Sequence, residues 1–314
     1  MGCPNCGQTG FRELFRATDR LYQTTSKMFQ VVECSACRLI RLEPRPSVTE
    51  LSQYYPQEYW YAPEPNVSSQ LEEAYRRFVL RDHLSFILRA VRDSGQNGPV
   101  LDVGCGGGLL LRMLQDRGLT VLGLDNSAAA AEAAWRYNGV RVLQADLSQP
   151  PIRAGTCTAI TMFHVVEHLY DPALYLEHAR ALLTRNGRLV VQVPNAASLQ
   201  FRLFGSRWNG ADVPRHLVDY RQRDLERLLE QSGFEVVRRK HFSLRDNPAG
   251  FASSLAPGLD PMARRVRKIH ESMPAKLAKD LVYFGLVLFG LPFAAFEAAL
   301  GAGSTIMVEA RKNT

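Results

Sequence analysis

Four glycines and an acid separate an apolar run from a helical pattern in VLDVGCGGGLLLRML, residues 100–114. Glycine lets the backbone approach a ligand closely and adopt φ values that other residues avoid. In an open α/β sheet the ligand crevice lies at the carboxyl ends of the strands, where this turn is expected. Asp102 suits a cation better than a pyrophosphate, and Leu109 stands where a dinucleotide fingerprint needs its third glycine. The turn therefore predicts a site for a positively charged ligand.

Two more carboxylates end the strand-like runs that follow. Asp125 ends TVLGLD, and Asp146 ends LQAD. A carboxylate at the first of these positions can accept both hydroxyls of a ribose. Either aspartate alone could equally cap a helix or a turn. Three successive strands that each end in an acid favour a ligand site over three separate caps.

The D-x-G-x-G-x-G spacing resembles motif I of the class I S-adenosylmethionine (SAM) methyltransferases. Residues 161–195 resemble later motifs of the branch that includes ubiquinone-biosynthesis O-methyltransferases and bacterial methyltransferases with a zinc ribbon. The resemblance implies that Asp102 holds the ammonium end of SAM, Asp125 the ribose and Asp146 the adenine amino group. The residues implied to line the SAM site are Asp102, Gly104, Gly106, Gly108, Asp125, Asn126, Asp146, Leu147, Phe163 and His164.

Histidines and a glutamate follow the next strand in FHVVEH. If this turn is helical, His164, Glu167 and His168 share one face, and His216 follows in a later loop. One interpretation makes a histidine the general base for an acceptor hydroxyl. A second makes all four residues ligands of a divalent metal, and a third makes them structural. The E-x-x-E-H metal motif of related enzymes has an acid where His164 stands, which disfavours Mg²⁺.

Two C-x-x-C pairs lie near the start of the chain, at Cys3 and Cys6 and at Cys34 and Cys37. Each pair can form a tight turn, and two such turns complete the tetrahedral sulfur site that is typical of structural Zn²⁺. A disulfide is the weaker alternative, because MGCPNCGQTG is unlike a secretory signal and a reducing cytosol is expected. Zinc would supply much of the stability of so short a segment.

Strands and helices alternate between residues 99 and 240. The strands are expected at VLDV, TVLGLD, VRVLQAD, TAITMF, GRLVVQV and FEVVRRK, with a late one at STIMVEAR, and the helices at 107–117, 127–138, 172–184 and 221–232. Strands this apolar are covered on both faces, which predicts an α/β fold with a doubly wound, mostly parallel seven-stranded sheet. One helix is expected over Leu71–Arg92. The predicted domains are a zinc ribbon (1–46), a helical linker (47–98), a SAM-binding domain (99–240), an insertion with a basic segment and an apolar hairpin (241–303) and an edge strand (304–314).

Basic charge adjoins an apolar run in the insertion. Met262–Lys279 holds six basic residues and one acid, and the sixteen residues Leu281–Phe296 carry no charge. A membrane span needs about 20 residues, and Pro292 would kink it. Residues 262–300 therefore either contact a membrane at its interface, with anionic headgroups near the basic segment, or form a buried lid or homodimer surface. A true membrane span is the least favoured alternative.

These features predict a cytoplasmic SAM-dependent methyltransferase, peripheral at the inner face of the membrane if the insertion binds lipid. The expected acceptor atom is an oxygen, in preference to carbon or nitrogen, of a small or lipid-linked metabolite. An RNA methyltransferase is disfavoured, because residues 1–98 hold 12 basic and 11 acidic side chains. A catalytically silent SAM-binding module stays an alternative. The aromatic run YYPQEYWYAP, residues 54–63, is interpreted as core rather than as the lining of an acceptor pocket.

Overall fold

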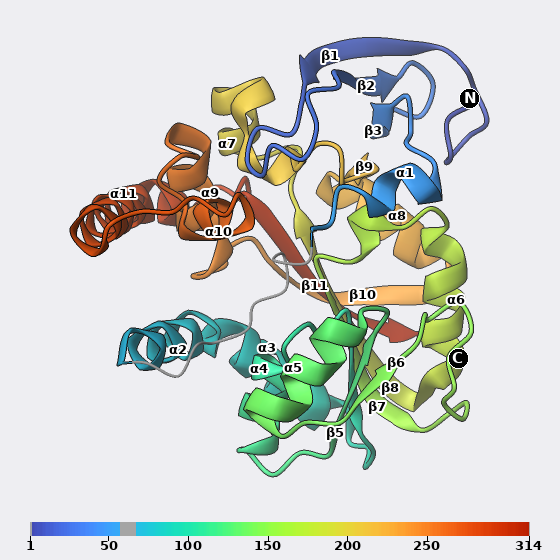
Figure 1. Ribbon diagram of the computed structural model, residues 1–314. Helices are drawn as coiled ribbons and strands as arrows, with labels where there is room; N and C mark the ends of the chain where they lie inside the picture. Colours follow the sequence, from blue (N-terminus) through green and yellow to red (C-terminus); the bar gives the residue numbers. More distant parts are fainter. Residues whose placement is uncertain (1, 57–66, 314) are drawn as a thin grey trace. The chain divides into compact units, whose positions relative to one another are not determined.

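The computed structural model of the protein describes residues 2–56 and 67–313 (Figure 1). Most of the aromatic run at residues 54–63 lies outside these ranges. The chain forms two compact units: unit 1 comprises Met1–Tyr59, Pro194–Asp224 and Asp246–Ile306, and unit 2 comprises Trp60–Val193, Leu225–Arg245 and Met307–Thr314. The predicted boundaries need correction, since residues 194–224 group with the cysteine segment and not with the glycine turn.

Unit 2 is built on a seven-stranded sheet in the order β10-β11-β8-β7-β4-β5-β6 (Figure 1). Its strands are β4 (Val100–Val103), β5 (Val121–Asp125), β6 (Val142–Gln144), β7 (Cys157–Phe163), β8 (Leu183–Pro194), β10 (Phe234–Lys240) and β11 (Thr305–Lys312). β4 pairs in parallel with β5 and β7, while β10 and β11 are antiparallel. The predicted doubly wound, mostly parallel sheet is confirmed.

Helices cover both faces of this sheet, with α3, α4 and α5 on one side and α6 and α8 on the other (Figure 1). The bounds of these helices are α3 (Arg81–Ser94), α4 (Leu109–Gln115), α5 (Ala128–Asn138), α6 (Pro172–Leu182) and α8 (Gln222–Gln231), and α2 (Val67–Val79) precedes α3. Ser127 and Asp171 cap α5 and α6 with their side chains. The prediction of a single helix over Leu71–Arg92 is wrong, because the helix is interrupted at Leu80, which separates α2 from α3. Apolar spacing alone does not reveal such a break.

Unit 1 contains a four-stranded sheet in the order β1-β2-β3-β9. The strands are β1 (Phe11–Ala17), β2 (Phe29–Cys34), β3 (Ile40–Glu43) and β9 (Val218–Asp219), and the nearby helices are α1 (Val48–Ser52) and α7 (Leu199–Phe204). Ile40 of β3 pairs with Asp219 of β9. The sheet of the cysteine segment is therefore completed by a strand from far along the chain, which ties the two segments together.

The remainder of unit 1 is helical: α9 (Asp246–Leu255), α10 (Pro261–Val266) and α11 (Met273–Ala299). The predicted apolar hairpin is wrong, because α11 is one helix of 27 residues that contains Pro292. Within the described part of the chain, α11 is the one helix long and apolar enough to cross a membrane by length and composition. Only 22% of its most apolar stretch is buried.

Candidate cofactor site and cysteine cluster

Three acids stand at the carboxyl ends of neighbouring parallel strands in unit 2. Asp102 lies in β4, Asp125 ends β5 and Asp146 follows β6 by two residues. β4 has β5 on one side and β7 on the other, so the order of the strands reverses there. Ligands of doubly wound sheets bind at this switch point. Asp102 and Asp125 are both buried, 5% and 3% exposed.

The glycine turn between β4 and α4 needs glycine for two physical reasons. Gly104, Gly106 and Gly108 have φ values of +69°, +52° and +73°, which side chains rarely tolerate. A Cβ atom at Gly108 would also lie 2.4 Å from a methyl group of Val140. Gly106 faces open space, and its N–H donates to Asp125 Oδ2 at 3.0 Å. The turn is thus fastened to β5 and keeps its backbone accessible.

Asp102 has the electrostatic character of a site for a cation. Burial raises its pKa to about 7, and the nearby charge of Asp125 adds to the rise. Two groups act against this rise in pKa. The hydroxyl of Thr161 donates to Asp102 Oδ1 at 2.5 Å, and the positive charge of Arg245 favours the ionised carboxylate. A buried carboxylate that ionises with this difficulty gains from a positively charged ligand. The ammonium group of SAM is such a ligand.

Asp125 is held in place by backbone donors. The N–H groups of Gly106 and Ser127 donate to its two oxygens at 3.0 and 2.9 Å. Burial raises its pKa despite these bonds. Each oxygen has a second lone pair, so the carboxylate can still accept a pair of ligand hydroxyls. Asn126, the next residue, is exposed.

Different neighbours set the pKa and the orientation of the Asp146 carboxylate. Burial would raise its pKa, but hydrogen bonds from Ser148 and Tyr175 outweigh burial and hold the pKa below its usual range. The Ser148 N–H lies 2.7 Å from Asp146 Oδ1, and the Tyr175 hydroxyl donates to Oδ2. Leu147 is buried, and its carbonyl lies 2.8 Å from His178 Nδ1. Asp146 is therefore ionised near neutral pH and rigidly oriented.

His164 occupies a strained position just after β7. Its φ of +56° lies in the left-handed region, which is rare for a histidine and is often associated with function. Its Nδ1 lies 3.3 Å from Glu167 Oε1, and its Nε2 lies 2.9 Å from Gln192 Nε2. A carboxylate accepts and an amide NH₂ donates, so Nδ1 carries the proton and Nε2 accepts. Both ring nitrogens are engaged within the protein. Phe163, which precedes it, is half-buried.

The predicted histidine cluster is divided between the two units. Val166–His168 form a short 3₁₀ helix, so His164 lies outside the helix although it still meets Glu167. The half-buried His168 and the buried Glu167 belong to unit 2. His216 is buried in unit 1, with its Nδ1 2.9 Å from the Gly210 carbonyl oxygen. That all four residues form one site stays a prediction.

The four cysteines converge in unit 1. Their sulfur atoms lie within 4.8 Å of one another, with 3.6 Å between Cys3 and Cys37 and between Cys6 and Cys34. A tetrahedral site with Zn–S bonds of about 2.3 Å places its sulfurs about 3.8 Å apart, close to these values. A disulfide needs about 2.05 Å. The residues present therefore fit a zinc ion.

Backbone amides support the same chemistry at Cys34. Burial opposes ionisation there, but hydrogen bonds from the N–H groups of Cys37 and Ala36 lower the pKa of its thiol to about 6. Amides that point at a thiolate are the expected feature of a metal-binding turn. Of the two remaining cysteines, Cys157 is buried and Cys105 is partly buried.

Sequence reasoning missed the side chains that orient the acids and His164. Thr161 faces Asp102 because β7 and β4 pair in parallel with these two residues in register. Gln192 reaches His164 from β8, the next strand along. The missing signal was the order of the strands, since a threonine and a glutamine inside apolar runs have no motif of their own.

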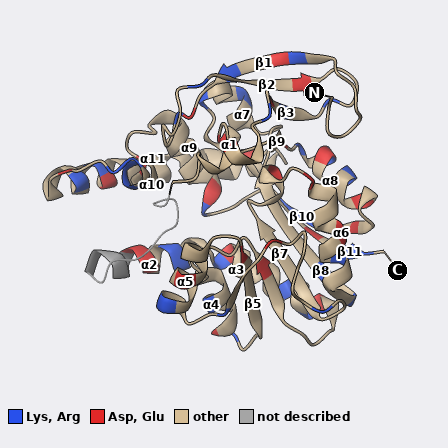
Figure 2. Cartoon of the chain, turned by 45° about the vertical axis from the view of Figure 1, so that its right-hand side comes forward, with Lys and Arg blue, Asp and Glu red and all other residues tan. Residues whose placement is uncertain are grey.

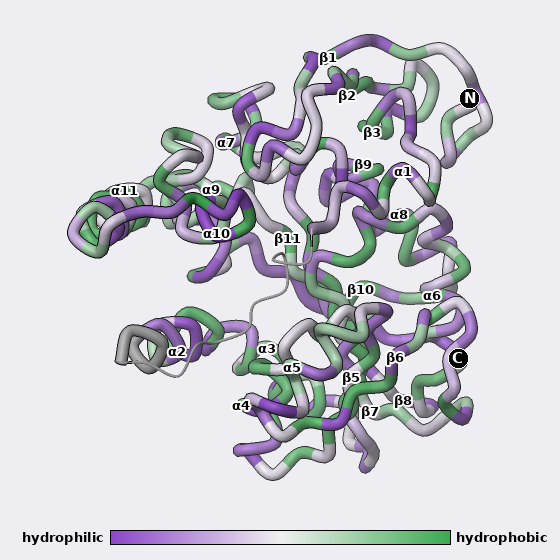
Figure 3. Tube along the Cα trace, viewed as in Figure 1, coloured by the Kyte–Doolittle hydropathy of each residue, from purple (hydrophilic) through white to green (hydrophobic). Residues whose placement is uncertain are grey.

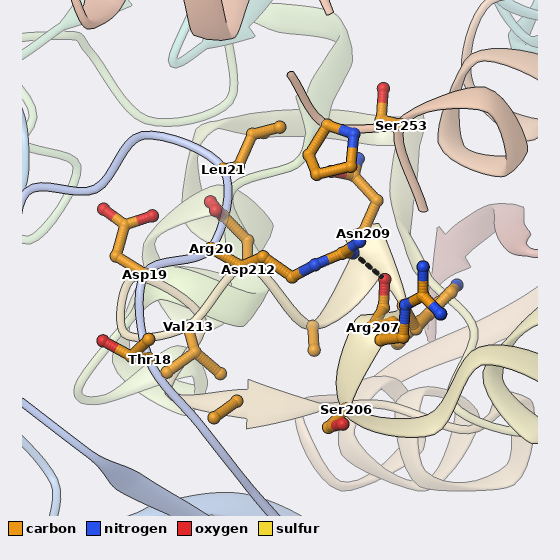
Figure 4. Close-up of a pocket in the computed structure, with 14 residues that line it drawn as sticks. Thr18, Asp19, Arg20, Leu21, Ser206, Arg207, Asn209, Asp212, Val213 and Ser253 are labelled. Atoms are coloured by element: carbon orange, nitrogen blue, oxygen red, sulfur yellow. Dashed lines mark hydrogen bonds between the residues drawn. The ribbon is translucent and has the colours of Figure 1, made fainter. Parts of the chain in front are cut away.

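A small cavity in unit 1 is lined from the β1–β2 loop and from residues 206–213 (Figure 4). Arg20 crosses it and donates to the carbonyl oxygens of Arg207 and Ser254 at 2.8 and 3.1 Å. The fully buried Arg215 pairs with Asp19 and Asp212 beside it. The cavity volume is about 30 Å³, enough for one or two water molecules. We therefore interpret it as a polar junction that joins the two segments.

Comparison with known proteins places this geometry in a family. A model of the methyltransferase domain matches residues 73–239. A "probable S-adenosylmethionine-dependent methyltransferase" of Mycolicibacterium smegmatis is 30% identical over 177 residues, which are 55% of this chain and 64% of the relative. A ubiquinone biosynthesis O-methyltransferase of Dinoroseobacter shibae is 29% identical over 152 residues, 45% of this chain and 61% of the relative. The chain thus spans a little under two thirds of each relative.

Among solved structures, a "putative sarcosine dimethylglycine methyltransferase" from Galdieria sulphuraria has the same fold. Its TM-score is 0.53 at 14% identity, with 81% of this chain and 92% of that chain covered. The fold, the family model and the relatives agree. The chain belongs to the methyltransferase domain family of class I SAM-dependent enzymes.

Proposed function

We propose that the protein transfers the methyl group of SAM to an oxygen of a small or lipid-linked acceptor. The observation that carries the proposal is the row of acids at one edge of the sheet. Asp102 in this row is buried, with a raised pKa, so a bound cation would stabilise its ionised form. The ubiquinone biosynthesis O-methyltransferases among the relatives support oxygen as the acceptor atom. The converging cysteines support a structural zinc ion in unit 1.

SAM supplies an activated methyl group, so the protein's task is chiefly to bind and orient. Asp102 receives the ammonium group, Asp125 the ribose hydroxyls and Asp146 the adenine amino group. The acceptor oxygen forms its bond to the methyl carbon as the carbon–sulfur bond breaks, and the sulfur keeps the electron pair. The acceptor proton passes to a base.

His164 acts in this proposal as a positioning residue at the SAM site. Its Nε2 accepts from Gln192, which makes it a poor general base or metal ligand in this geometry. His168 and His216 stay the candidates for the base. Nδ1 of His216 donates to the Gly210 carbonyl, so its lone pair lies on Nε2.

The proposal is tested by offering tritiated methyl-SAM and the purified chain to hydroxylated acceptors: catechols, phenolic lipids and polyprenyl-linked sugars. We expect label in one acceptor class, with an equal amount of S-adenosylhomocysteine (SAH) formed. SAH binding without transfer to any acceptor would instead indicate a silent module. Label that appears in added RNA would favour an RNA methyltransferase.

Replacing His164 by alanine is expected to lower kcat about 100-fold, because misplacement of the methyl group weakens in-line transfer. The Kd for SAM should change much less. His164→Asn is the matched control, since asparagine tolerates a positive φ and can still donate to Glu167, so it should retain more activity than alanine. An unchanged kcat in His164→Ala would end this assignment.

A further inference from the structure

We infer that α11 binds in the plane of an anionic lipid surface through its outward face. The inference goes beyond the proposed methyl transfer, because membrane binding needs no turnover and is measured separately. It rests on three observations within unit 1. These are the division of α11 into a packed face and an exposed face, the polar anchor at its end, and the basic residues at its start.

One face of α11 is packed against the protein. Val287, Gly290, Ala294 and Glu297 are its buried residues, spaced three or four apart. The ring of Phe251 in α9 packs here, and a Cβ atom at Gly290 would lie 2.8 Å from that ring. The spacing of three or four residues between the buried positions places them in a single stripe along the helix.

The opposite face is apolar and exposed. Nine of the 21 large hydrophobic side chains that are exposed in the described structure lie in this helix and its C-cap. They are Met273, Leu277, Leu281, Val282, Phe284, Leu288, Phe289, Phe296 and Leu300. Leu277, Leu281 and Leu288 are 59%, 62% and 53% exposed and share one side of the helix. Figure 3 shows the green, hydrophobic turns of α11. A monomer in water rarely leaves such a stripe uncovered.

The end of α11 argues for an in-plane helix rather than a membrane span. Glu297 is fully buried, and its carboxylate accepts from the side-chain amide of Gln200 at 2.7 Å and from the N–H of Ser304 at 3.2 Å. Crossing the membrane would pull this face away from α9 and leave a carboxylate in hydrocarbon, which is costly. Binding through the outward face leaves the anchor intact.

The charges at the start of α11 identify the surface as anionic. Glu271 and Asp280, the acids of this segment, both pair with Arg264, and Glu271 also pairs with Lys279. The segment 262–280 still has a net charge of +4. Figure 2 shows charged residues gathered at α10 and at one end of α11, with tan along the rest. Basic residues beside an apolar helical face match anionic headgroups above acyl chains.

A second copy of the chain matches this face less well. Protein interfaces place a polar rim around their apolar centre. Between residues 281 and 296 the sequence holds no charged side chain. A uniform apolar stripe that ends in basic residues is the pattern of an interfacial helix.

The experiment is flotation of the purified chain with phosphatidylcholine vesicles, prepared with and without phosphatidylglycerol. We expect binding to the anionic vesicles, weaker binding to the neutral ones, and weakening of the former by salt. The triple variant Leu277→Ser/Leu281→Ser/Leu288→Ser should lower partitioning about tenfold or more. The matched control replaces Met28, Trp135 and Leu203, which are similarly exposed outside α11, by serine and should bind like the wild type.

Thermal unfolding of both triple variants, compared with that of the wild type, checks that they are folded. The inference is overturned if the folded wild type ignores anionic vesicles, or if the α11 variant binds them as well as the wild type does. It is also overturned if sedimentation shows a lipid-free dimer that the α11 variant converts to a monomer, because a second copy then covers this face. Each of these results leaves the proposed methyl transfer to its own test.

Discussion

Replacing Asp102 by asparagine is expected to weaken SAM binding at least about 100-fold, because the ligand's ammonium group would be left without its buried counter-charge. The same substitution should make the unliganded protein more stable at pH 8 by a few degrees in Tm. A single change would thus separate binding from stability. Calorimetric titration with SAM and thermal unfolding without ligand measure the two effects.

The pH dependence follows from the raised pKa of Asp102. Its folded value of about 7 lies above the unfolded value of about 4, so ionising the buried group above pH 7 destabilises the folded state. This cost shrinks as the pH falls through 7 and vanishes near 4. The advantage of Asp102→Asn should therefore be full at pH 8 and absent at pH 4.

Asp146→Asn is the control of opposite sign. The pKa of Asp146 lies below its usual range, so its ionised form stabilises the folded state at any pH above the ordinary pKa of an aspartate. Its loss should lower Tm at pH 8. A lower Tm for Asp102→Asn at pH 8, or unchanged SAM affinity, would contradict the electrostatic account of the site.

Replacing Cys34 by alanine is expected to remove the bound zinc ion and to lower Tm by more than about 10 °C, because the free energy of metal binding is part of the folding free energy of a small sulfur site. Cys157→Ala is the matched control, since it removes a buried thiol outside the cluster. It should keep one zinc per chain and lose far less stability. Elemental analysis and thermal unfolding measure both.

A Cys34→Ala protein that keeps its zinc, or a wild type purified without zinc that is equally stable, would remove the structural role of the cluster. Removing zinc with a chelator measures the contribution of the metal to Tm in a second way. Slow removal of zinc from the wild type should reproduce the Tm of the variant.

Much of the fold was predictable because it depends on local pattern. The seven strands follow from short apolar runs, and the acids follow from where those runs end. The two C-x-x-C pairs converge as expected because each pair forms a turn by itself. These features depend on neighbours in sequence, or on the general rule that the carboxyl ends of parallel strands share one edge.

What the sequence did not reveal depends on partners far along the chain. β9 completes the sheet of the cysteine segment, and Thr161 faces Asp102 only because β7 lies beside β4. The apolar run that contains Pro292 was expected to form a hairpin, but α11 continues through this residue, which lies on the exposed side of the helix. Nothing local marks His164 as the residue that adopts a positive φ between Glu167 and Gln192.

The central claim is that the acid-lined glycine turn binds SAM. The most direct test is native mass spectrometry of the 314-residue chain with SAM or SAH, beside Asp102→Asn and with bound metal recorded in the same spectra. The account predicts one nucleoside ligand and one zinc on the wild type, and zinc without ligand on the variant. A wild type that stays free of both SAM and SAH at saturating concentration would contradict it.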